Sequence, residues 1–431
     1  MNWQKEYKKK LKSAEDAVKE IKNGDRVYFA FPRQPFSLTK ALEARRDELE
    51  EVEVLLEAPR VDNLWVAPNK KESFKLVVTI HPGPKMRPWL KKKRTTYLPT
   101  VFSIEAKTLR ERTETRDIDV YLGVISPPDK NGFCSFGPEL WNKKNCVKSA
   151  KKVIAEVDNS FIRTYGNNFI HVSQIDHLVE YTPEQLSDEQ FEQYLMSWPE
   201  EKKPIMRKVF NTLAPNQRAE HMMSVIKAGY DEKYLKFYLD GFGFGEPSDE
   251  VKMICGYLKP LIRNGDCLQI GVAGISGWVP NLNVLNDKLD LGYHGEQASR
   301  GIGTLIKNGV INGKKKTFHP GKAVFTSLSG FSGDEIQFSD NNPNIELYPA
   351  EYVVNIGNIS KNDNQVAINT ILGIDLTGQI SAESISGGMI IAGAGGQTES
   401  HIGAVLSRGG RAFSLLRSTA STDKGPVSRI V

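Results

Sequence analysis

Short runs of apolar, often β-branched residues recur along the chain, and stretches with helical spacing of apolar positions separate them. The runs comprise residues 26–31, 52–56, 75–80, 120–125 and 267–272. Near-continuous apolar runs of this length are typical of strands that are buried on both faces of a parallel sheet. Because parallel strands need crossover connections, the pattern predicts an α/β fold with mostly parallel sheets.

Two short motifs occur twice, in the same order and at similar spacing. Asp25 and Asp266 each follow Asn-Gly, after a helical stretch and before a strand-like run. The pattern D-x-x-G-x-x-S begins at Asp129 and again at Asp375. Two motifs in register favour an internal repeat over chance, and repeats determine architecture. We therefore predict two related α/β halves.

The repeat divides the chain into two halves with a charged segment between them. We expect residues 1–185 and 251–431 to form the halves, and residues 186–250 a helical insert or linker. Residues 206–238 have helical spacing, and residues 240–247 have the composition of a loop. A helical hairpin on the surface and a lid over the site both remain open for the insert. Ligands of such sheets collect at the carboxyl ends of the strands, where we expect the site.

Composition and charge exclude several classes of protein. The chain has 431 residues, more than one ordinary core needs, and is 39% hydrophobic and 25% charged. Its net charge of +5 is too diffuse to predict a nucleic-acid partner. No run of 18 apolar residues and no signal-like N-terminus occur, so we expect no membrane partner and a cytoplasmic location.

The cysteines give no indication of a metal site. Cys134, Cys146, Cys255 and Cys267 form no C-x-x-C pair and have no histidine cluster beside them. We therefore expect buried or half-buried free thiols and no metal. Arg33, near the first strand, could pair with a substrate carboxylate, but the simpler expectation for an arginine is that it faces water.

Glu296 is the first candidate for chemistry. It follows His294-Gly295 and precedes a run of helical character, residues 297–307, which predicts an exposed carboxylate at a strand-to-helix turn. With a reference pKa of about 4.3, a glutamate is ionised at neutral pH and needs no base to act as a nucleophile. The same position also suits a structural glutamate that is favoured by the helix macrodipole.

Two further features lie near the C-terminus. Gly393, Gly395 and Gly396 precede a second helical run, and glycines in this position let backbone N–H groups approach an anion. They do not form the complete dinucleotide-binding fingerprint. Asn369 lies in a strand-like run, where its amide needs partners if it is buried. That amide could be structural or could donate to an oxyanion.

Residues 126–137, S-P-P-D-K-N-G-F-C-S-F-G, resemble a signature of the acetyl-CoA hydrolase/transferase family. Within it the chain is most similar to 4-hydroxybutyrate CoA-transferases. Further matching segments are residues 97–99, 169–173, 319–322, 341–343, 375–383, 393–397 and 424–430. The resemblance covers most of residues 15–185 and 250–431. It implies a CoA-transferase-like (NagB/RpiA-like) architecture, coenzyme A as substrate with no tightly bound cofactor, and a homo-oligomer, either dimer or tetramer.

The resemblance also implies residue roles and a reaction. Glu296 corresponds to the family's catalytic glutamate, and Asn369 and the backbone N–H of Gly396 correspond to the oxyanion hole. In the family, the glutamate attacks an acyl-CoA thioester to give a mixed anhydride. The CoA thiolate converts the anhydride to a glutamyl-CoA thioester, and a second carboxylate then takes the CoA. The implied substrates are an acyl-CoA and a small acid of the acetate, butyrate or 4-hydroxybutyrate type.

CoA contacts are expected along the glycine-rich segments. Residues 271–280 stand where the family has a more compact glycine loop, which implies contacts from Gly271, Gly274 and Gly277. Gly393, Gly395 and Lys322 complete the expected substrate-binding set. Family members usually continue past residues 428–430, so a C-terminal segment is expected to be missing.

Three other functions remain open from the sequence. In an acyl-CoA hydrolase, water would complete the cycle instead of a second acid. The altered glycine loop also fits a CoA-binding homologue whose activity is lost or depends on a partner. A phosphosugar isomerase on a related architecture would leave the signature at residues 126–129 unexplained. The acyl group and the acceptor acid are not determined.

Overall fold

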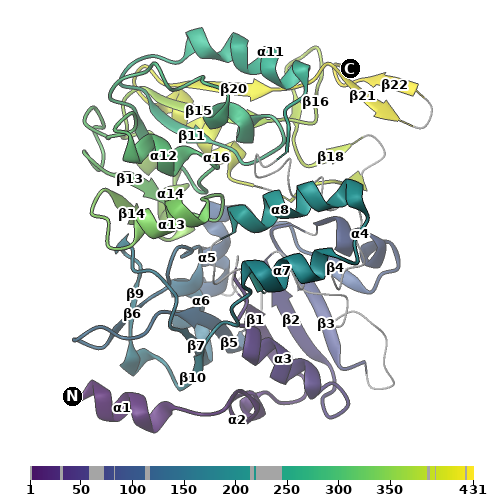
Figure 1. Ribbon diagram of the computed structural model, residues 1–431, viewed down its shortest axis with the longest axis vertical. Helices are drawn as coiled ribbons and strands as arrows, with labels where there is room; N and C mark the ends of the chain where they lie inside the picture. The colour runs from purple at the N-terminus through teal and green to yellow at the C-terminus, as the bar shows by residue number, and fades with distance from the viewer. Residues whose placement is uncertain are drawn as a thin grey trace.

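The protein is described by a computed structural model that covers residues 2–29, 33–57, 72–81, 83–111, 117–213, 218–219, 245–385, 389–393, 395–422 and 425–431. Over these residues the chain forms two seven-stranded sheets that lie one above the other in Figure 1, with helices packed around them. All strand pairs within both sheets are parallel. The predicted fold class is therefore confirmed.

The first sheet has the order β10-β7-β5-β1-β2-β3-β4. Its strands are β1 (Arg26–Phe29), β2 (Val52–Leu56), β3 (Phe74–Val78), β4 (Thr95–Tyr97), β5 (Ile118–Ile125), β7 (Ala150–Asp158) and β10 (His177–Tyr181). Every residue of β1 and nearly every residue of β5 is buried, as expected for strands covered on both faces. Residues 30–32, the end of the first predicted strand, lie outside the described residues.

The second sheet repeats this order as β20-β15-β11-β12-β13-β14, and β8 is added at its edge. Its strands are β8 (Tyr165–Gly166), β11 (Cys267–Ile270), β12 (Gly292–His294), β13 (Ala323–Phe325), β14 (Ile345–Leu347), β15 (Gln365–Thr370) and β20 (Arg411–Leu415). Because β8 comes from the first half of the chain and pairs with β14, the two halves interlock. The predicted domain boundaries remain predictions.

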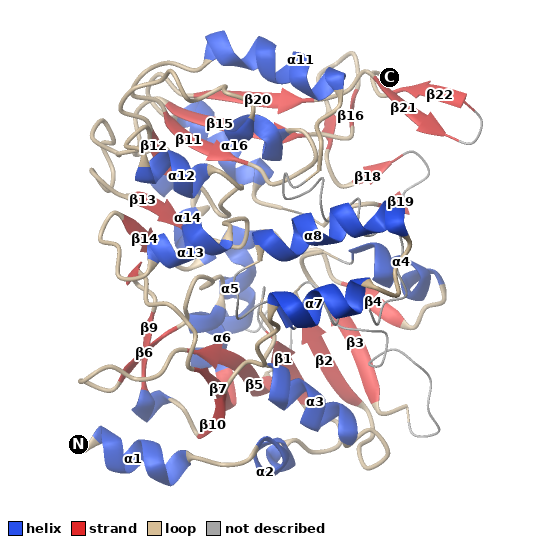
Figure 2. Cartoon of the chain, in the orientation of Figure 1, coloured by secondary structure: helices blue, strands red, loops and turns tan. Residues whose placement is uncertain are grey.

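Helices connect and cover the strands (Figure 2). The described α-helices are α1 (Trp3–Lys10), α2 (Ala14–Ala17), α3 (Phe36–Ala44), α4 (Gly83–Lys91), α5 (Phe102–Glu111), α6 (Lys143–Ser149), α7 (Asp188–Leu195), α8 (Lys203–Thr212), α11 (Asp249–Leu258), α12 (Ile302–Lys307), α13 (Gly333–Ser339), α14 (Ala350–Val353), α15 (Ile356–Ile359) and α16 (Gln397–Leu406). Short 3₁₀ turns are η1 (Val18–Glu20), η3 (Val172–Gln174), η4 (Glu200–Lys202), η5 (Lys259–Leu261) and η6 (Ser276–Asn281).

Small antiparallel ladders complete the structure. They pair β6 (Phe133–Ser135) with β9 (Phe169–His171), β16 (Gly373–Ile374) with β17 (Ile380–Ser381), β18 (Ser384–Ile385) with β19 (Met389–Ile390), and β21 (Thr419–Thr422) with β22 (Gly425–Ser428). These ladders lie outside the two large sheets.

The two repeated motifs form the same local structures in both halves. The carboxylate of Asp25 accepts a hydrogen bond from the backbone N–H of Lys22, and Asp266 accepts one from Arg263 in the same way. Asp129 and Asp375 each accept from the N–H groups two and four residues later. Such turns are built from contacts within five residues, so a repeated sequence reproduces them locally. The predicted internal repeat is confirmed at these positions.

The described part of the insert contains two helices with a small apolar core of their own. Phe191 of α7 and Phe210 of α8 stack with ring centroids 3.9 Å apart. The two helices cross the front of the molecule at the height where the two halves meet (Figure 1). Residues 214–217 and 220–244, which include most of the predicted loop, lie outside the described residues. The described residues show two packed helices, and both the surface hairpin and the lid stay predictions for the insert as a whole.

Arg33 does not face water, so that expectation was wrong. Its side chain is 8% exposed, its Nη2 lies 2.8 Å from Oδ2 of the fully buried Asp158, and its guanidinium lies over Phe161. The sequence contains no local signal for this pair, because the two residues meet only when the chain folds. Removing one partner of a buried ion pair leaves an uncompensated charge.

We expect Arg33→Ala to lower the free energy of unfolding by about 3 kcal/mol, because Asp158 stays buried without its cation. Arg94→Ala removes a partly exposed pair with Glu72 and should cost less than about 1 kcal/mol. Urea denaturation of both variants measures the difference. Equal destabilisation would contradict the assignment of Arg33 as a buried structural charge.

The four cysteines are free and buried, as the sequence predicted. Burial raises the pKa of the Cys267 thiol to about 11, so it is not a reactive thiolate at neutral pH. Within the described ranges, no group of three or more His, Cys, Asp or Glu side chains could hold a metal ion. The helices described there include none that is long and apolar enough to cross a membrane.

Candidate active site

The two halves contact each other at a loop that precedes α16. The backbone at Gly393 passes so close to the end of β3 that an added Cβ would lie 1.2 Å from the carbonyl oxygen of Ile80. The guanidinium of Arg87 donates a hydrogen bond to the carbonyl oxygen of Ile391. A buried apolar cluster fills the adjacent space and consists of Ile80, Phe102, Trp141, Ala350 and Val354. The glycine loop is therefore held between the halves.

Glu296 lies beyond the carboxyl end of β12, and its backbone is fixed by β13. The carbonyl oxygen of Glu296 accepts hydrogen bonds from the N–H groups of Thr326 and Ser327, at 2.9 and 3.0 Å. The hydroxyl of Tyr293 donates to the carbonyl oxygen of Gln297 on the other side. These contacts fix the backbone on both sides of Glu296. Its side chain is the part of the residue that can contact a ligand.

The structure corrects the expected strand-to-helix turn at Glu296. The chain bends at Glu296, Gln297 forms an isolated parallel bridge with Ser327, and α12 begins only at Ile302. Gly301, in the left-handed region at φ 92°, precedes that helix. Glu296 therefore receives no N–H group from the helix that follows it in sequence. Pairing with β13 overrides the helical spacing of residues 297–301.

Helix α16, from the C-terminal part of the chain, supplies an N–H group to Glu296 instead. The N–H of Gly396, the N-cap residue of α16, donates a hydrogen bond to the Glu296 carboxylate. An added Cβ on Gly396 would lie 1.9 Å from Oε2 of Glu296 and 3.3 Å from Cγ1 of Val354. Only glycine leaves room for this contact. The structure thus brings Glu296 and Gly396 together, two of the three predicted catalytic residues.

The surroundings change the protonation of Glu296. Burial, and then the charge of Glu399, raise the pKa of Glu296 to about 8, while the hydrogen bond from Gly396 acts in the opposite direction. The expectation that this glutamate is ionised at neutral pH therefore does not hold for the protein without substrate. Enclosed carboxyl groups with raised pKa values are typical of functional sites.

Asn369, the third predicted catalytic residue, is buried on β15 and pairs with a residue that sequence reasoning missed. Its Nδ2 donates to Oε1 of Gln269 at 2.9 Å, and its Oδ1 accepts from Nε2 of the same side chain at 3.2 Å. Gln269 lies on β11, and its Cγ lies 3.3 Å from where a Cβ on Gly295 would be. The Asn369–Gln269 amide pair therefore lies beside the segment that carries Glu296.

The glycine segment after β11 lies beside this amide pair. The N–H of Gly271 bonds to Ile368, and an added Cβ on Gly271 would lie 2.5 Å from Oδ1 of Asn369. Gly277 is buried inside η6, and its N–H bonds to Ala273. Gly274 faces open space, with no atom within 4 Å of an added Cβ. Of the three, Gly274 is accessible to a ligand.

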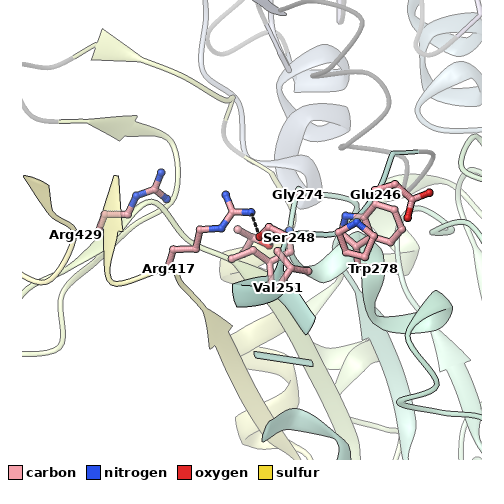
Figure 3. Close-up of a pocket in the computed structure, with 10 residues that line it drawn as sticks. Glu246, Ser248, Val251, Gly274, Trp278, Arg417 and Arg429 are labelled. Atoms are coloured by element: carbon pink, nitrogen blue, oxygen red, sulfur yellow. Dashed lines mark hydrogen bonds between the residues drawn. The ribbon is translucent and has the colours of Figure 1, made fainter. Parts of the chain in front are cut away.

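Gly274 lines a cavity of about 190 Å³ that two arginines also line (Figure 3). Arg417 and Arg429 lie on one side, and Glu246 and Trp278 on the other. Nη2 of Arg417 donates to the Ser248 hydroxyl at 3.1 Å. Burial, and then the charge of Arg417, lower the pKa of Arg429. Two cations placed so close to each other favour an anionic ligand.

The remaining predicted binding residues lie in different places. Gly395 is next to Gly396 and has no atom within 4 Å of an added Cβ, whereas Gly393 is packed against Ile80. Lys322 precedes β13 at its amino end, where Nζ donates to the carbonyl oxygen of Pro343 at 2.6 Å and lies 3.8 Å from Glu346. Lys322 lies at the amino end of β13, whereas Glu296 and residues 271–277 follow the carboxyl ends of β12 and β11, so the structure does not bring Lys322 to them.

Sequence comparison places this geometry among known proteins. A model of the acetyl-CoA hydrolase/transferase N-terminal domain matches residues 1–186, and one of the C-terminal domain matches residues 334–431. The 4-hydroxybutyrate coenzyme A transferase of Clostridium kluyveri is 35% identical over 431 residues, which is 100% of this chain and 86% of that protein. The chain belongs to the acetyl-CoA hydrolase/transferase family.

Other family members agree with this assignment. The butyryl-CoA:acetate CoA-transferase of Anaerostipes caccae is 28% identical, with 100% of this chain and 85% of that protein covered. Among solved structures, RipA from Yersinia pestis has a TM-score of 0.76 and 26% identity, with 100% and 86% of the chains covered. A 4-hydroxybutyrate CoA-transferase from Porphyromonas gingivalis has a TM-score of 0.68 and 26% identity at the same coverage. The resemblance inferred from the motifs is confirmed.

Proposed function

We propose that the protein is a CoA-transferase that moves CoA from an acyl-CoA to a small carboxylic acid through a glutamyl-CoA thioester on Glu296. Family membership and the names of the relatives support CoA transfer. The observation that carries the proposal is the placement of the Glu296 carboxylate against the N–H of Gly396, at the start of α16 and between the two halves. The cytoplasmic location, expected from the sequence, and the homo-oligomer, implied by the resemblance, stay predictions.

The proposed reaction uses these two groups directly. An oxygen of ionised Glu296 attacks the thioester carbon, the C–S bond breaks, and a mixed anhydride and the CoA thiolate result. The thiolate then attacks the anhydride at the Glu296 carbonyl carbon and releases the first acid as its carboxylate. The acceptor carboxylate then attacks the Glu296 thioester. The same two steps run in reverse and give the new acyl-CoA and ionised Glu296. The charge on Glu296 thus leaves with the released acid, and the atoms and electrons balance.

One backbone N–H group and one side-chain amide stabilise the oxyanion that develops in each attack. The Gly396 N–H is fixed at a helix N-terminus, so it needs no reorganisation when charge appears. One such donor lowers the barrier by about 3 kcal/mol. We assign a second donor to the Asn369 amide, because Gln269 holds it in a fixed orientation. The raised pKa of Glu296 makes its ionised form the more nucleophilic one.

The covalent intermediate gives the test of this proposal. Incubation with acetyl-CoA or butyryl-CoA without acceptor, followed by borohydride, should reduce a Glu296 thioester to an alcohol and lower the mass of that peptide by about 14 Da. The pH should be kept near 8, where half of Glu296 is ionised. Protein that binds CoA but shows no mass change at Glu296 would overturn the proposed nucleophile. Thioester formation itself releases one equivalent of free acid, so continued release beyond one equivalent per Glu296 would instead identify a hydrolase.

We further propose that the cavity beside Gly274 receives a phosphate-bearing part of CoA. At about 190 Å³ the cavity is too small for the whole cofactor and suits one of its anionic groups. Arg417 and Arg429 supply charge-assisted hydrogen bonds, and Thr370, next to Asn369 on β15, connects the cavity to the proposed oxyanion donor. CoA would then extend from the arginines toward Glu296.

Arg429→Ala should raise the KM for acetyl-CoA about tenfold and leave kcat unchanged, because the lost contact exists in both ground and transition states. For acetyl-pantetheine, which lacks the phosphates, the KM of the variant should equal that of the wild type. Arg408→Ala is the matched control, since Arg408 is an exposed arginine paired with Asp363 and does not line the cavity. Steady-state kinetics with both thioesters measure the effect, and an unchanged KM would contradict this placement of CoA.

A further inference from the structure

Glu399 is a buried carboxyl group that the reaction above does not use. It is the third residue of α16 and is 2% exposed. Its Oε1 accepts a hydrogen bond from the backbone N–H of Ser103 at 3.1 Å, and its Oε2 has no hydrogen-bond partner among the described residues. A buried oxygen without a partner costs free energy, so its retention needs an explanation.

The position of Glu399 relates it directly to the nucleophile. Gly396, at the start of α16, donates to Glu296, and Glu399 follows one helical turn later on the same end of the helix. The partial positive charge of a helix N-terminus favours carboxylates, and here two carboxyl groups share it. Burial raises the pKa of Glu399 as well as that of Glu296, so ionising both carboxyl groups is costly. After burial, the charge of Glu399 is the second cause that raises the pKa of Glu296.

No cation on the packed elements neutralises Glu399 within the described part of the chain. The titratable groups there whose side chains the structure describes are Glu105, Lys107 and Glu111 on α5, Glu351 and Tyr352 on α14, His401 on α16 and Arg411 on β20. Lys107 pairs with Glu111, and Arg411 pairs with Asp266. Burial lowers the pKa of His401, which favours its neutral form. The strand β15 and the helix α15, which also pack on α16, carry no titratable residue.

We propose that Glu399 is a positioning residue for the nucleophile: its carboxyl group, anchored on α5, directs Glu296 onto the Gly396 N–H and makes ionised Glu296 more reactive. This inference rests on the function proposed above. When Glu296 becomes an anhydride, its negative charge passes to the CoA thiolate, and when it becomes the thioester, the charge leaves with the released acid. The repulsion from Glu399 then disappears, which favours the intermediate over the free enzyme.

The anchor also connects the two halves of the molecule. Ser103 belongs to α5 of the first half, whereas Glu399 and Gly396 belong to α16 of the second. α5 and α14 are packed against each other beside this contact. The orientation of Glu399, and through it that of Glu296, therefore depends on how the halves meet. Glu399 is separated from Ser103 by almost 300 positions in the chain, so no local motif indicates this role.

The test is the pH dependence of thioester formation on Glu296, measured by borohydride trapping in single turnovers. In the wild type, the rate should rise with pH along a limb near pH 8, as Glu296 ionises. In Glu399→Gln, which keeps the shape and removes the charge, the limb should move to lower pH by about one unit. The rate on the plateau should fall, because a less basic carboxylate is a weaker nucleophile.

Two further variants make the result specific. Glu399→Asp keeps the charge, but its shorter side chain moves the carboxyl group away from Ser103. The pH at which the rate of thioester formation rises should therefore stay near that of the wild type, while the rate on the plateau falls. Glu335→Gln removes another buried carboxyl group, which accepts from Thr304 and Ser332 on α12 and α13, and should leave limb and plateau unchanged. Far-ultraviolet circular dichroism shows whether each variant is folded.

The outcomes separate this inference from the proposed function. If the rate of thioester formation in Glu399→Gln depends on pH as it does in the wild type and reaches the same plateau, the proposed role of Glu399 is overturned. The proposed function is then left intact. A wild-type enzyme that forms no thioester at Glu296 would overturn both. If Glu399→Gln does not fold, the Glu399→Asp variant decides, because an unchanged plateau there would contradict positioning by the anchored carboxyl group.

Discussion

Glu296→Gln should abolish CoA exchange between acetyl-CoA and a carboxylate, with a loss of about 10⁴-fold or more. The amide has nearly the same shape and can still meet the Gly396 N–H, but it cannot form the anhydride and thioester. Exchange of labelled acetate into acetyl-CoA measures the loss. Glu335→Gln, in which a buried carboxyl group outside the site is removed, is the matched control and should keep its activity.

The same variant should be more stable than the wild type at high pH. The folded-state pKa of Glu296 is raised to about 8, above the value of about 4.3 expected in the unfolded chain. Protonated Glu296 therefore contributes stability that is fully present below pH 4 and is lost as the pH rises through 8. Glu296→Gln removes this loss, so its Tm should exceed that of the wild type by more at pH 9 than at pH 5. Calorimetry at both pH values measures the shift.

If Glu296→Gln is inactive and yet more stable than the wild type at pH 9, its loss of activity does not result from unfolding. Activity of Glu296→Gln close to that of the wild type would contradict the proposed nucleophile. An equal Tm difference at both pH values would contradict the raised pKa and leave the nucleophile in place.

Gly396→Ala should lower the rate of exchange by about 10²–10³-fold, the usual cost of losing one oxyanion donor. The added Cβ would lie 1.9 Å from Oε2 of Glu296, so the carboxylate must move away from the N–H that orients it. Because that oxygen is at the free end of a flexible side chain, the clash can be relieved at little cost to folding. We expect kcat to fall while the free energy of unfolding changes by less than about 1 kcal/mol.

Gly256→Ala is the matched control for this substitution. Gly256 lies inside α11, and an added Cβ there meets no atom within 4 Å. The same chemical change should leave exchange unaffected and raise the free energy of unfolding by about 0.5–1 kcal/mol, because alanine favours the helix. Stopped-flow or steady-state exchange and urea denaturation measure both quantities. A Gly396→Ala enzyme with wild-type kcat would contradict the contact between Gly396 and Glu296.

Several features were predictable because they arise from neighbours in the chain. Near-continuous runs of apolar residues identified strands such as β2 and β5 to within a few residues. The turns at Asp129 and Asp375 are formed within five residues, so their repetition in the sequence indicated the two related halves. The motif at residues 126–137 and the further matching segments identified the family before any geometry was known.

Other features could not be predicted, because they depend on residues that are distant in the chain. The periodicity of residues 297–307 is helical, yet the first part of this segment pairs with Ser327, just after β13, and the helix begins only at Ile302. Gln269 and Glu399 carry no motif of their own and become part of the site only through Asn369 and Ser103. Arg33 was expected in water because Asp158 lies 125 positions away.

The sequence by itself therefore determined the fold class, the duplication and the residues Glu296, Gly396 and Asn369 as candidates, since composition, periodicity and short motifs are properties of the chain. The tertiary structure decided their chemical state. Whether Glu296 is ionised depends on burial, on the Gly396 N–H and on a second carboxyl group, Glu399, that folding brings beside it. A pKa is set by the three-dimensional distribution of charge and solvent, and the order of residues does not contain that distribution.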